Sequence, residues 1–195
     1  MLATDFPSDA DGKAIPFGIY DVAQNAGFVV VGTSHETAAF ALAAIRKWWL
    51  MIGRVRYAGQ HQLLIEADGG GANNKRSWLW HAALQALADE FDLTITVRHL
   101  PPSASKWNLI EHRLFSAISD NWAGQPLVSY ETVLKFIRAT KTTTGLRCVA
   151  YLDRTDYKIG LRVTAAAYAL IRLKRHRIFP DWNYTLCPHP MTGRP

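Results

Sequence analysis

Two acidic residues, Asp68 and Glu111, stand at positions that favour chemistry over a role in solubility. Asp68 ends the apolar, strand-like run 63–67 and leads directly into the glycine turn 69–71. Glu111 lies within the apolar stripe of a predicted helix over 107–122, so we expect its carboxylate to point at the core. A buried, ionised carboxylate without a partner is costly, and such a glutamate therefore needs a cation, a metal ion or a catalytic role. The two carboxylates together predict a metal site.

A divalent metal site of this kind suits phosphodiester chemistry. Mg²⁺ prefers hard oxygen ligands and keeps part of its water shell, so one or two carboxylates and the phosphate oxygens of a substrate can hold it. Two such ions, about 4 Å apart, can activate a nucleophile and stabilise the leaving oxygen. Asp68 and Glu111 would be two ligands, and a third carboxylate is normally needed to bridge the ions. Lys106, His112 and Arg113 flank Glu111 and could hold phosphates or the nucleophile, although each also fits a surface or packing role.

Positive charge is concentrated in the last third of the chain. Residues 1–131 contain ten Lys or Arg against thirteen Asp or Glu, whereas residues 132–195 contain twelve against three. Such a surface attracts phosphate polymers or anionic membranes, and the lack of a basic amphipathic helix with an aromatic face favours nucleic acid. A solvated basic face that serves solubility is the simpler alternative. The candidate DNA-binding residues near the C-terminus are Arg172, Lys174, Arg175 and Arg177.

The composition predicts a soluble protein with a sizeable core. Its 195 residues fit one domain, and 49% of them are hydrophobic. The chain has no uncharged apolar run of about 18 residues and no leader-like N-terminus, so we expect a cytoplasmic protein without membrane association. Two cysteines are too few for a disulfide framework or a metal knuckle. We expect four tryptophans to be core residues rather than base-stacking platforms: Trp78, Trp80, Trp107 and Trp122.

Hydrophobic periodicity and turn residues predict the elements that position these side chains. Strands are expected at about 16–22, 28–32, 62–68, 93–99 and 146–153, and helices from one of residues 33–36 to 52, then at 75–91, 107–122, 129–140 and 163–177. This order predicts an α/β fold in which helices flank a mixed sheet. Ligands of such open sheets gather at the carboxyl ends of strands, and Asp68 lies at an end of this kind.

Two long segments around the acidic residues resemble a known family. The segment 64–73, LIEADGGGAN, and the segment 101–115, PPSASKWNLIEHRLF, resemble the second and third acidic motifs of the Rhodopirellula-type DDE transposases, which bacterial insertion sequences encode. Motifs of this length and order are far more specific than an isolated Asp and Glu. Shorter matches lie at 12–21, 126–132, 143–146 and 182–184, so the resemblance covers nearly the whole chain.

The resemblance implies an RNase H-like catalytic domain that performs divalent-metal-dependent phosphoryl transfer, meaning DNA cleavage and strand transfer. Its Asp-Asp-Glu ligand set would make Asp68 the second Asp and Glu111 the Glu, with 42 residues between them. The implied cofactor is Mg²⁺ or Mn²⁺. The implied partners are DNA, as transposon ends and target, and further copies of the chain assembled on it, in a bacterial and nucleoid-associated setting.

The first Asp of the family has no clear counterpart in this sequence. In the family it belongs to an early strand upstream of the segment that matches 12–21, whereas Asp5, Asp9 and Asp11 lie in a polar arm. Asp21 ends a hairpin strand and matches a different family position, which makes it a weak candidate for a replacement ligand. We therefore expect an N-terminally truncated domain that lacks its first strand, is marginally stable and has little or no strand-transfer activity.

The expected organisation is a loose arm at 1–12, a partial RNase H-like catalytic domain at 13–140 and a basic C-terminal extension at 141–195. The alternative function is a non-catalytic, DNA-binding remnant of a transposase that uses its basic third. A third interpretation, an unrelated metal nuclease or a plain α/β domain, would require the long motif matches to be coincidence.

Overall fold

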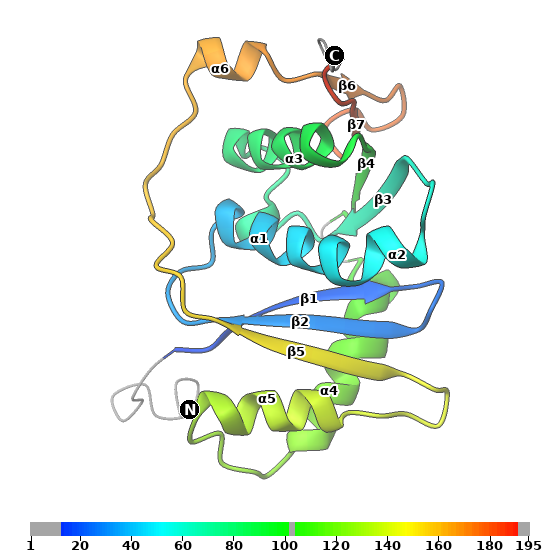
Figure 1. Cartoon of the computed structure of the whole chain (residues 1–195), viewed down its shortest axis with the longest axis vertical. Coiled ribbons are helices and arrows are strands. Elements are labelled where there is room, and N and C mark those ends of the chain that lie inside the picture. Colours follow the sequence, from blue (N-terminus) through cyan, green and yellow to red (C-terminus); the bar gives the residue numbers. More distant parts are fainter. Residues whose placement is uncertain (1–12, 102–103, 191–195) are drawn as a thin grey trace. The chain divides into compact units, whose positions relative to one another are not determined.

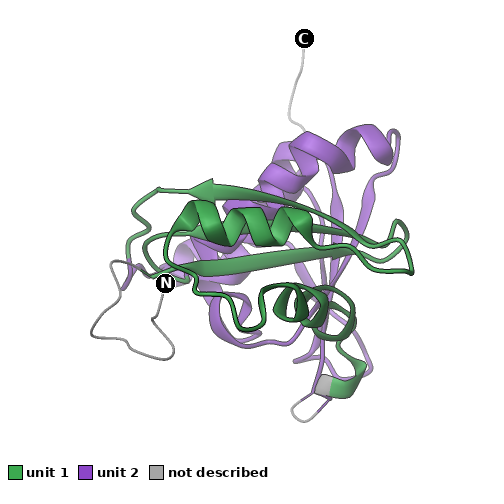
Figure 2. Cartoon of the chain, turned by 90° about the horizontal axis from the view of Figure 1, so that it is seen from below, with its two compact units in different colours: residues 1–36, 106–158 green, residues 37–105, 159–195 purple. Residues whose placement is uncertain are grey.

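Hydrophobic and β-branched segments form seven strands within the part of the chain that is described, residues 13–101 and 104–190 of a computed structural model (Figure 1). The strands make two mixed sheets with flanking helices. The chain divides into two units: unit 1 comprises residues 1–36 and 106–158, and unit 2 comprises 37–105 and 159–195 (Figure 2). The predicted α/β class is confirmed, and it is compatible with an RNase H-like fold.

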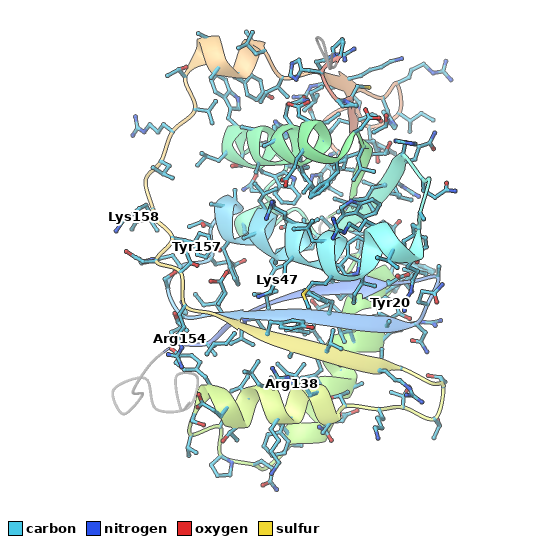
Figure 3. The ribbon with its side chains drawn as sticks, viewed as in Figure 1. Tyr20, Lys47, Arg138, Arg154, Tyr157 and Lys158 are labelled. Carbon is cyan, nitrogen blue, oxygen red and sulfur yellow. The ribbon has the colours of Figure 1, made fainter. Side chains whose placement is uncertain are left out.

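The sheet of unit 1 has the strand order β1-β2-β5. β1 (Ile15–Asp21) and β2 (Ala26–Gly32) form an antiparallel hairpin, and β5 (Arg147–Asp153) runs parallel to β2. Asn25 turns the hairpin with a φ of 48°, a conformation that asparagine adopts more readily than most residues. Its Oδ1 accepts a hydrogen bond of 2.9 Å from the hydroxyl of Tyr20 (Figure 3). All three strands lie where the sequence predicts strands.

Two helical segments pack on this sheet and bury one apolar cluster. The first runs through the π-helical turn η5 (Glu111–Phe115) into α4 (Ser116–Trp122), and the second is α5 (Tyr130–Ala139). Arg138 on α5 donates to the carbonyl of Ala150 on β5 (Figure 3). The cluster consists of Val29, Val31, Leu114, Ile118, Val133, Leu134, Ile137, Leu146, Cys148 and Ala150.

A glycine on β2 allows the first helical segment to approach the sheet closely. A β-carbon at Gly27 would lie 2.9 Å from Sγ of Cys148 and would also collide with the Leu114 side chain. Any larger residue would therefore push η5 away from β2 or displace β5. Burial in this contact raises the pKa of the Cys148 thiol to about 11, so the thiol stays protonated at neutral pH.

The sheet of unit 2 has the strand order β3-β4-β7-β6. β3 (Gln62–Ala67) and β4 (Thr94–His99) are parallel and are connected by α3 (Trp78–Phe91), which makes a βαβ unit. β7 (Asn183–Leu186) pairs antiparallel with both β4 and β6 (Leu173–Arg175). Because β3 and β4 run in the same direction, their carboxyl ends lie at the same edge of the sheet.

Helices α1 and α3 build the rest of unit 2. α1 (Ala38–Trp48) begins after Thr37, whose Oγ1 accepts a 3.2 Å hydrogen bond from the N–H of Phe40, and it continues through the π-helical turn η2 (Trp49–Gly53) into α2 (Arg54–Arg56). α1 packs on α3, and α3 packs on β4 and β7. The fully buried side chains of this unit include Phe40, Trp80, Leu84, Leu87, Leu93, Ile95 and Tyr184.

The predicted helix over 163–177 is wrong. Within that range only α6 (Ala165–Ala169) is helical, and residues 173–175 form β6. The backbone N–H of Arg172 donates to Oε1 of Gln85 at 2.8 Å, and the residues that follow pair with β7. Pairing with a later strand therefore overrides the local helical pattern.

The described residues also contain two short 3-10 turns, η3 (Gly71–Asn73) and η4 (Ser105–Trp107).

The remaining expectations have mixed outcomes. Trp80 is a core residue with 1% exposure, as expected, whereas Trp78 and Trp107 are 43% and 67% exposed, so the prediction of core positions is wrong for these two. The arm at 1–12 lies outside the described residues, and the boundary between residues 140 and 141 stays a prediction. Within the described ranges, no helix combines the length and the apolar character needed to cross a bilayer.

Candidate metal site and nucleic-acid contacts

Asp68 directly follows β3 and is exposed, at the strand-end position that the sequence predicts. The register of the parallel pair sets Ala67 opposite His99, the last residue of β4. Oδ1 of Asp68 accepts a hydrogen bond of 3.1 Å from the N–H of Gly70. With its amide turned so that the nitrogen faces the carboxylate, Asn73 donates a second bond of 3.1 Å to the same oxygen. The glycine turn therefore orients the carboxylate of Asp68 through one of its oxygens.

Gly69 lets this turn lie directly against His99. Its φ is +75°, and a β-carbon at this position would be 3.3 Å from Nδ1 of His99. Residues other than glycine adopt such a φ only at a cost in free energy. The requirement for glycine here is therefore both conformational and steric, and it couples the direction of the Asp68 side chain to the imidazole ring.

The ring of His99 belongs to a buried hydrogen-bond network. Its Nε2 lies 3.0 Å from Oη of Tyr184, which also accepts a 3.0 Å hydrogen bond from Nε1 of Trp80. Since Trp80 supplies a donor to this oxygen, the Tyr184 hydroxyl can donate to Nε2, and the ring proton then resides on Nδ1. Among the described residues Nδ1 of His99 has no hydrogen-bond partner. A buried N–H thus faces the turn that carries Asp68.

His99 is neutral at pH 7. Burial lowers its pKa to about 4; the charges of His81 and Lys75 act in the same direction, and that of Asp68 opposes them. A neutral imidazole can donate one hydrogen bond toward the Asp68 turn. It does not present a full positive charge that would compete with a metal ion for the carboxylate.

Glu111 is exposed at the start of η5, so the prediction that it points at the core is wrong. The N–H of Ser116 bonds to the carbonyl of Glu111, five residues earlier, which is the π-helical pattern. Because each residue of such a turn rotates less about the axis than in an α-helix, projecting Glu111 from Leu114 with α-helical geometry misplaces the carboxylate. Leu114 itself is fully buried. The argument that burial forces a metal ion onto Glu111 therefore no longer applies.

The donor chemistry of both residues still fits a divalent cation. Asp68 and Glu111 each offer exposed carboxylate oxygens, the ligands that Mg²⁺ and Mn²⁺ prefer. Asp68 belongs to unit 2 and Glu111 to unit 1, so their convergence on a shared ion stays a prediction. Across the residues that the structure describes, no three His, Cys, Asp or Glu side chains gather into a metal-binding group.

Asp21 has a structural contact in the first hairpin. It ends β1, is only 9% exposed, and its Oδ1 accepts a hydrogen bond of 3.2 Å from the N–H of Gln24. This bond stabilises the turn between β1 and β2. The buried side chain therefore has a role in the hairpin, whereas its use as a replacement metal ligand stays a prediction.

The sequence of the whole chain was also compared with known proteins. A family model described as the Rhodopirellula transposase DDE domain matches residues 1–188. The chain belongs to this family. No curated protein and no solved structure matches the chain. The expected family is confirmed, and DDE transposases typically use divalent metal ions, which agrees with the oxygen ligands offered by Asp68 and Glu111.

Two candidate DNA-binding residues of this transposase-family chain lie beside Glu111 in unit 1. Lys106 is exposed in η4, with its Nζ 5.1 Å from the ring centroid of Trp107. Arg113 is exposed within η5. Both cations are accessible to a phosphate, and Trp107 adds an exposed aromatic surface next to Lys106.

The other four candidates are exposed on and around β6 in unit 2. Arg172 donates to the carbonyl of Pro188, and Arg175 donates to that of Pro180 at 3.0 Å and pairs with Asp181 at 3.2 Å. These two arginines therefore also stabilise the backbone around the strand. Lys174 and Arg177 complete the group.

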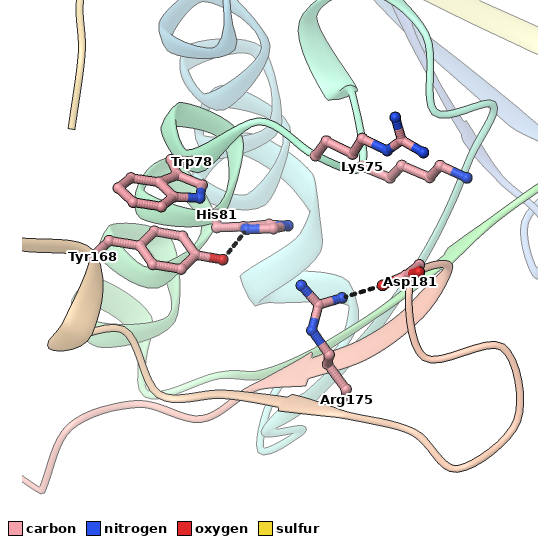
Figure 4. Close-up of a pocket in the computed structure, with 7 residues that line it drawn as sticks. Lys75, Trp78, His81, Tyr168, Arg175 and Asp181 are labelled. Atoms are coloured by element: carbon pink, nitrogen blue, oxygen red, sulfur yellow. Dashed lines mark hydrogen bonds and ion pairs between the residues drawn. The ribbon is translucent and has the colours of Figure 1, made fainter. Parts of the chain in front are cut away.

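Sequence reasoning missed a pocket in unit 2 of this DDE-family protein (Figure 4). One signal was available: Lys75 and Arg76 directly precede the N-terminus of α3, and Trp78 and His81, three residues apart, share a face of that helix. The other contributors come from distant segments that no local pattern connects. The residues that line the pocket are Lys75, Arg76, Trp78, His81, Tyr168, Arg175 and Asp181.

Proposed function

We propose that this chain is a DDE-type transposase catalytic domain whose chemistry is divalent-metal-dependent phosphoryl transfer on DNA. The family match over residues 1–188 is the observation that carries the proposal. The exposed carboxylate of Asp68, at the carboxyl end of β3, supports it independently because ligands of α/β sheets gather at such ends.

In this proposal Asp68 and Glu111 hold Mg²⁺ or Mn²⁺. Bound ions of this kind supply an activated hydroxyl nucleophile and charge stabilisation for the leaving oxygen of a phosphodiester. Gly70 and Asn73 orient Oδ1 of Asp68 through their N–H groups. Lys106 and Arg113 bind phosphates beside Glu111, which keeps the DNA backbone near that carboxylate.

The proposal includes weak metal binding and little strand transfer by the chain on its own. This part of the proposal rests on the expectation that Asp68 and Glu111 are the two positions that match the family's three carboxylates. A pair of ions needs a bridging ligand, so two carboxylates hold it poorly. Assembly of several copies on DNA and a nucleoid-associated location remain part of the same prediction.

Metal binding by the full chain tests the site. We expect Asp68→Asn to weaken Mn²⁺ affinity, measured by calorimetry, at least about tenfold, the lower end of the effect of removing even an outer-shell partner of a metal. The matched control is Glu66→Gln, an exposed carboxylate on the same strand that pairs with Arg98 at 3.6 Å. Equal Mn²⁺ affinities for the two variants would contradict the proposal that Asp68 is a metal ligand.

A cleavage assay tests the incompleteness separately. Purified chain incubated with plasmid DNA and Mg²⁺ is expected to give little or no nicking above a metal-free control. Strong, magnesium-dependent nicking that Asp68→Ala abolishes would support the metal role of Asp68 and would contradict the predicted lack of a third ligand.

A non-catalytic DNA-binding protein is the second candidate, favoured by the exposed cations around β6. DNA affinity that falls steeply with salt and is unchanged by Mg²⁺ or by Asp68→Asn would support it. DNA affinity that rises with Mg²⁺ in the wild-type chain and not in Asp68→Asn would instead support the metal-dependent enzyme.

A further inference from the structure

The pocket of unit 2 encloses about 250 Å³ between the start of α3, α6 and the loop that joins β6 to β7 (Figure 4). This volume lies just below the range of small-molecule sites, which starts at about 300 Å³. A pocket of this size suits one group of a larger ligand better than a whole metabolite.

Positive charge dominates the lining. Lys75, Arg76 and Arg175 face a single carboxylate, Asp181, which already pairs with Arg175 at 3.2 Å. Nζ of Lys75 lies 2.7 Å from the ring centroid of Trp182. Desolvation and the charge of Arg76 lower the pKa of Lys75, and Asp181 only partly opposes them. The cations thus exceed the acidic groups available to neutralise them, which favours an anionic ligand.

The N-terminus of α3 adds to this preference. The helix has 14 residues, and its first turn contains no acidic side chain. Its N–H groups and dipole therefore give the pocket side of the helix a partial positive charge that no carboxylate of that turn offsets. Ser77 Oγ accepts from the N–H of Trp80 at 3.3 Å, which satisfies one of these donors and leaves the preference for an anion in place.

A buried histidine faces the same pocket. His81 is 1% exposed, and its Nδ1 lies 2.8 Å from the hydroxyl of Tyr168. Figure 4 shows the second ring nitrogen pointing away from Tyr168, toward the side of the pocket where Lys75 and Arg175 lie. This Nε2 makes no hydrogen bond of normal geometry among the described residues, although the Lys75 backbone is close enough to raise the pKa slightly. Burial and the charge of Arg175 lower that pKa to about 4, so the ring is neutral.

An aromatic surface borders the cations. The rings of Trp78 and Tyr168 are stacked, with centroids 4.2 Å apart, and Trp78 remains 43% exposed. Proteins that bind single-stranded nucleic acids combine an exposed aromatic side chain, on which a base stacks, with neighbouring cations that bind phosphates. Arg177, two residues after Arg175, is a further exposed cation on the loop after β6, whereas Lys174 alternates to the other face of the strand. A nucleic acid, which offers a base as well as a phosphate, fits this pairing of an exposed ring with cations better than an isolated anion does.

We propose that this pocket binds one phosphate group of a DNA strand, with Lys75, Arg76 and Arg175 as its cationic ligands and Trp78 as a stacking surface for an adjacent base. The inference rests on the proposed action on DNA and adds a contact to it within unit 2. Tyr184 packs against both His81, at 4.9 Å between ring centroids, and His99, at 5.6 Å. One buried layer therefore supports both the pocket and the turn of Asp68, so a strand that reaches Asp68 can place another phosphate here.

Two substitutions with opposite effects on charge test the proposal with the full chain, an oligonucleotide without terminal phosphates and no divalent metal. Lys75→Ala is expected to weaken binding of a single-stranded oligonucleotide about three- to tenfold and to lower the slope of log affinity against log salt by about 0.7, the value for one lost phosphate contact on a single strand. Asp181→Asn removes the one carboxylate among the described residues that line the pocket and is expected to tighten DNA binding about twofold or more. A damaged fold cannot produce this gain.

The matched control is Lys135→Ala, which removes the same charge from an exposed position of α5 in unit 1 and is expected to change affinity less than about twofold. Equal losses for Lys75→Ala and Lys135→Ala, or a failure of Asp181→Asn to tighten binding, would overturn the pocket as a DNA contact.

Inorganic phosphate separates failure of the pocket from failure of the proposed function. We expect its addition to shift the imidazole signals of His81 in a saturable way, as followed by heteronuclear NMR, and Lys75→Ala to abolish the shift. If phosphate gives this shift while no variant binds DNA, the anion pocket stands but its DNA partner and the transposase proposal fall. If DNA binding is intact while His81 does not respond and Lys75→Ala behaves as the control does, the pocket inference alone is overturned.

Discussion

Gly69 is the residue that holds the Asp68 turn against its support. Its φ of +75° and the 3.3 Å separation between an added β-carbon and Nδ1 of His99 leave no unstrained place for a side chain. Any substitution there must move either the turn or the imidazole. The carboxylate of Asp68, one residue earlier, would move with the turn because Oδ1 is bonded to the N–H of Gly70.

We therefore predict different costs for two glycine substitutions in the same unit. Gly59 also has a positive φ, of +78°, but nothing lies within 4 Å of an added β-carbon, so Gly59→Ala should lower the free energy of unfolding only by the backbone cost of about 1–2 kcal/mol. Gly69→Ala should cost more because it adds the contact with His99. Urea unfolding of both variants measures the difference, and equal costs would contradict the proposed contact.

At the level of single residues, the sequence located one carboxylate well and misjudged the direction of the other. Asp68 was predictable because an apolar run followed by glycines ends a strand at a known place. Glu111 was not, because the inserted residue of a π-helical turn leaves no pattern in the sequence before the i→i+5 hydrogen bond is seen. The pocket was missed because Tyr168 and Asp181 join Lys75 only through tertiary structure.

Helix and sheet in unit 1 meet at Leu114, in the middle of η5. The side chain is fully buried, whereas Leu109, on the turn before η5, is 37% exposed. Both residues carry the same side chain on one helical segment. Their different burial therefore allows the packing of this segment on β2 to be measured separately from its helical propensity.

We predict that Leu114→Ala lowers the free energy of unfolding by about 2–5 kcal/mol, the usual cost of a cavity at a buried leucine. Leu109→Ala should cost less, at most about 2 kcal/mol, because its side chain is already 37% exposed and its removal leaves no closed cavity. Chemical denaturation followed by circular dichroism measures both. A similar loss for the two variants would show that η5 does not pack on the sheet as described.

Most elements could be predicted because their periodicity is local. The strands at 15–21, 26–32, 62–67 and 94–99 alternate or run apolar between turn residues, and the structure contains all of them. The segment 163–177 failed because its residues 173–175 obtain their partner from β7, and the backbone N–H of Arg172 bonds to Gln85 rather than within a helix. Neither partner is visible in a window of local sequence.

At the scale of the whole molecule, the chain crosses between its two units three times, and the last crossing, from unit 1 to unit 2, lies between residues 158 and 159. Residues 154–164, which contain this crossing, form neither helix nor strand. The beginning of the segment is fixed to unit 1, since Ser34 Oγ donates to the carbonyl of Thr155 at 2.8 Å and accepts from the N–H of Tyr157 at 3.1 Å. Lys158 (labelled in Figure 3) and Arg162 follow these bonds and are exposed.

We predict that limited trypsin digestion of the native protein cuts first after Lys158 or Arg162, because a protease needs extended, accessible backbone. Arg98 and Arg147 serve as internal controls: both side chains are exposed, but their backbones belong to β4 and β5. Mass spectrometry of the first fragments identifies the cut, and early cleavage after either control arginine would contradict the assignment.

The same experiment tests the sheet of unit 2. After the cut, the fragment that starts at residue 159 or 163 still contains β6 and β7, and β7 pairs with β4 of the other fragment. The two fragments should therefore elute together from a sizing column under native conditions. Separation without denaturant would mean that the pairing of β4 with β7 is too weak to hold them.

The thiol of Cys148, buried on β5 beside Leu114, also allows the opening of unit 1 to be timed. Cys187 is only half-buried, so an alkylating reagent modifies it first in the native protein. Cys148 becomes reactive only while its strand and the helix above Gly27 are apart, since it is protonated and shielded until then. The rate of the second, slower alkylation therefore measures how often that sheet opens spontaneously, without any engineered label.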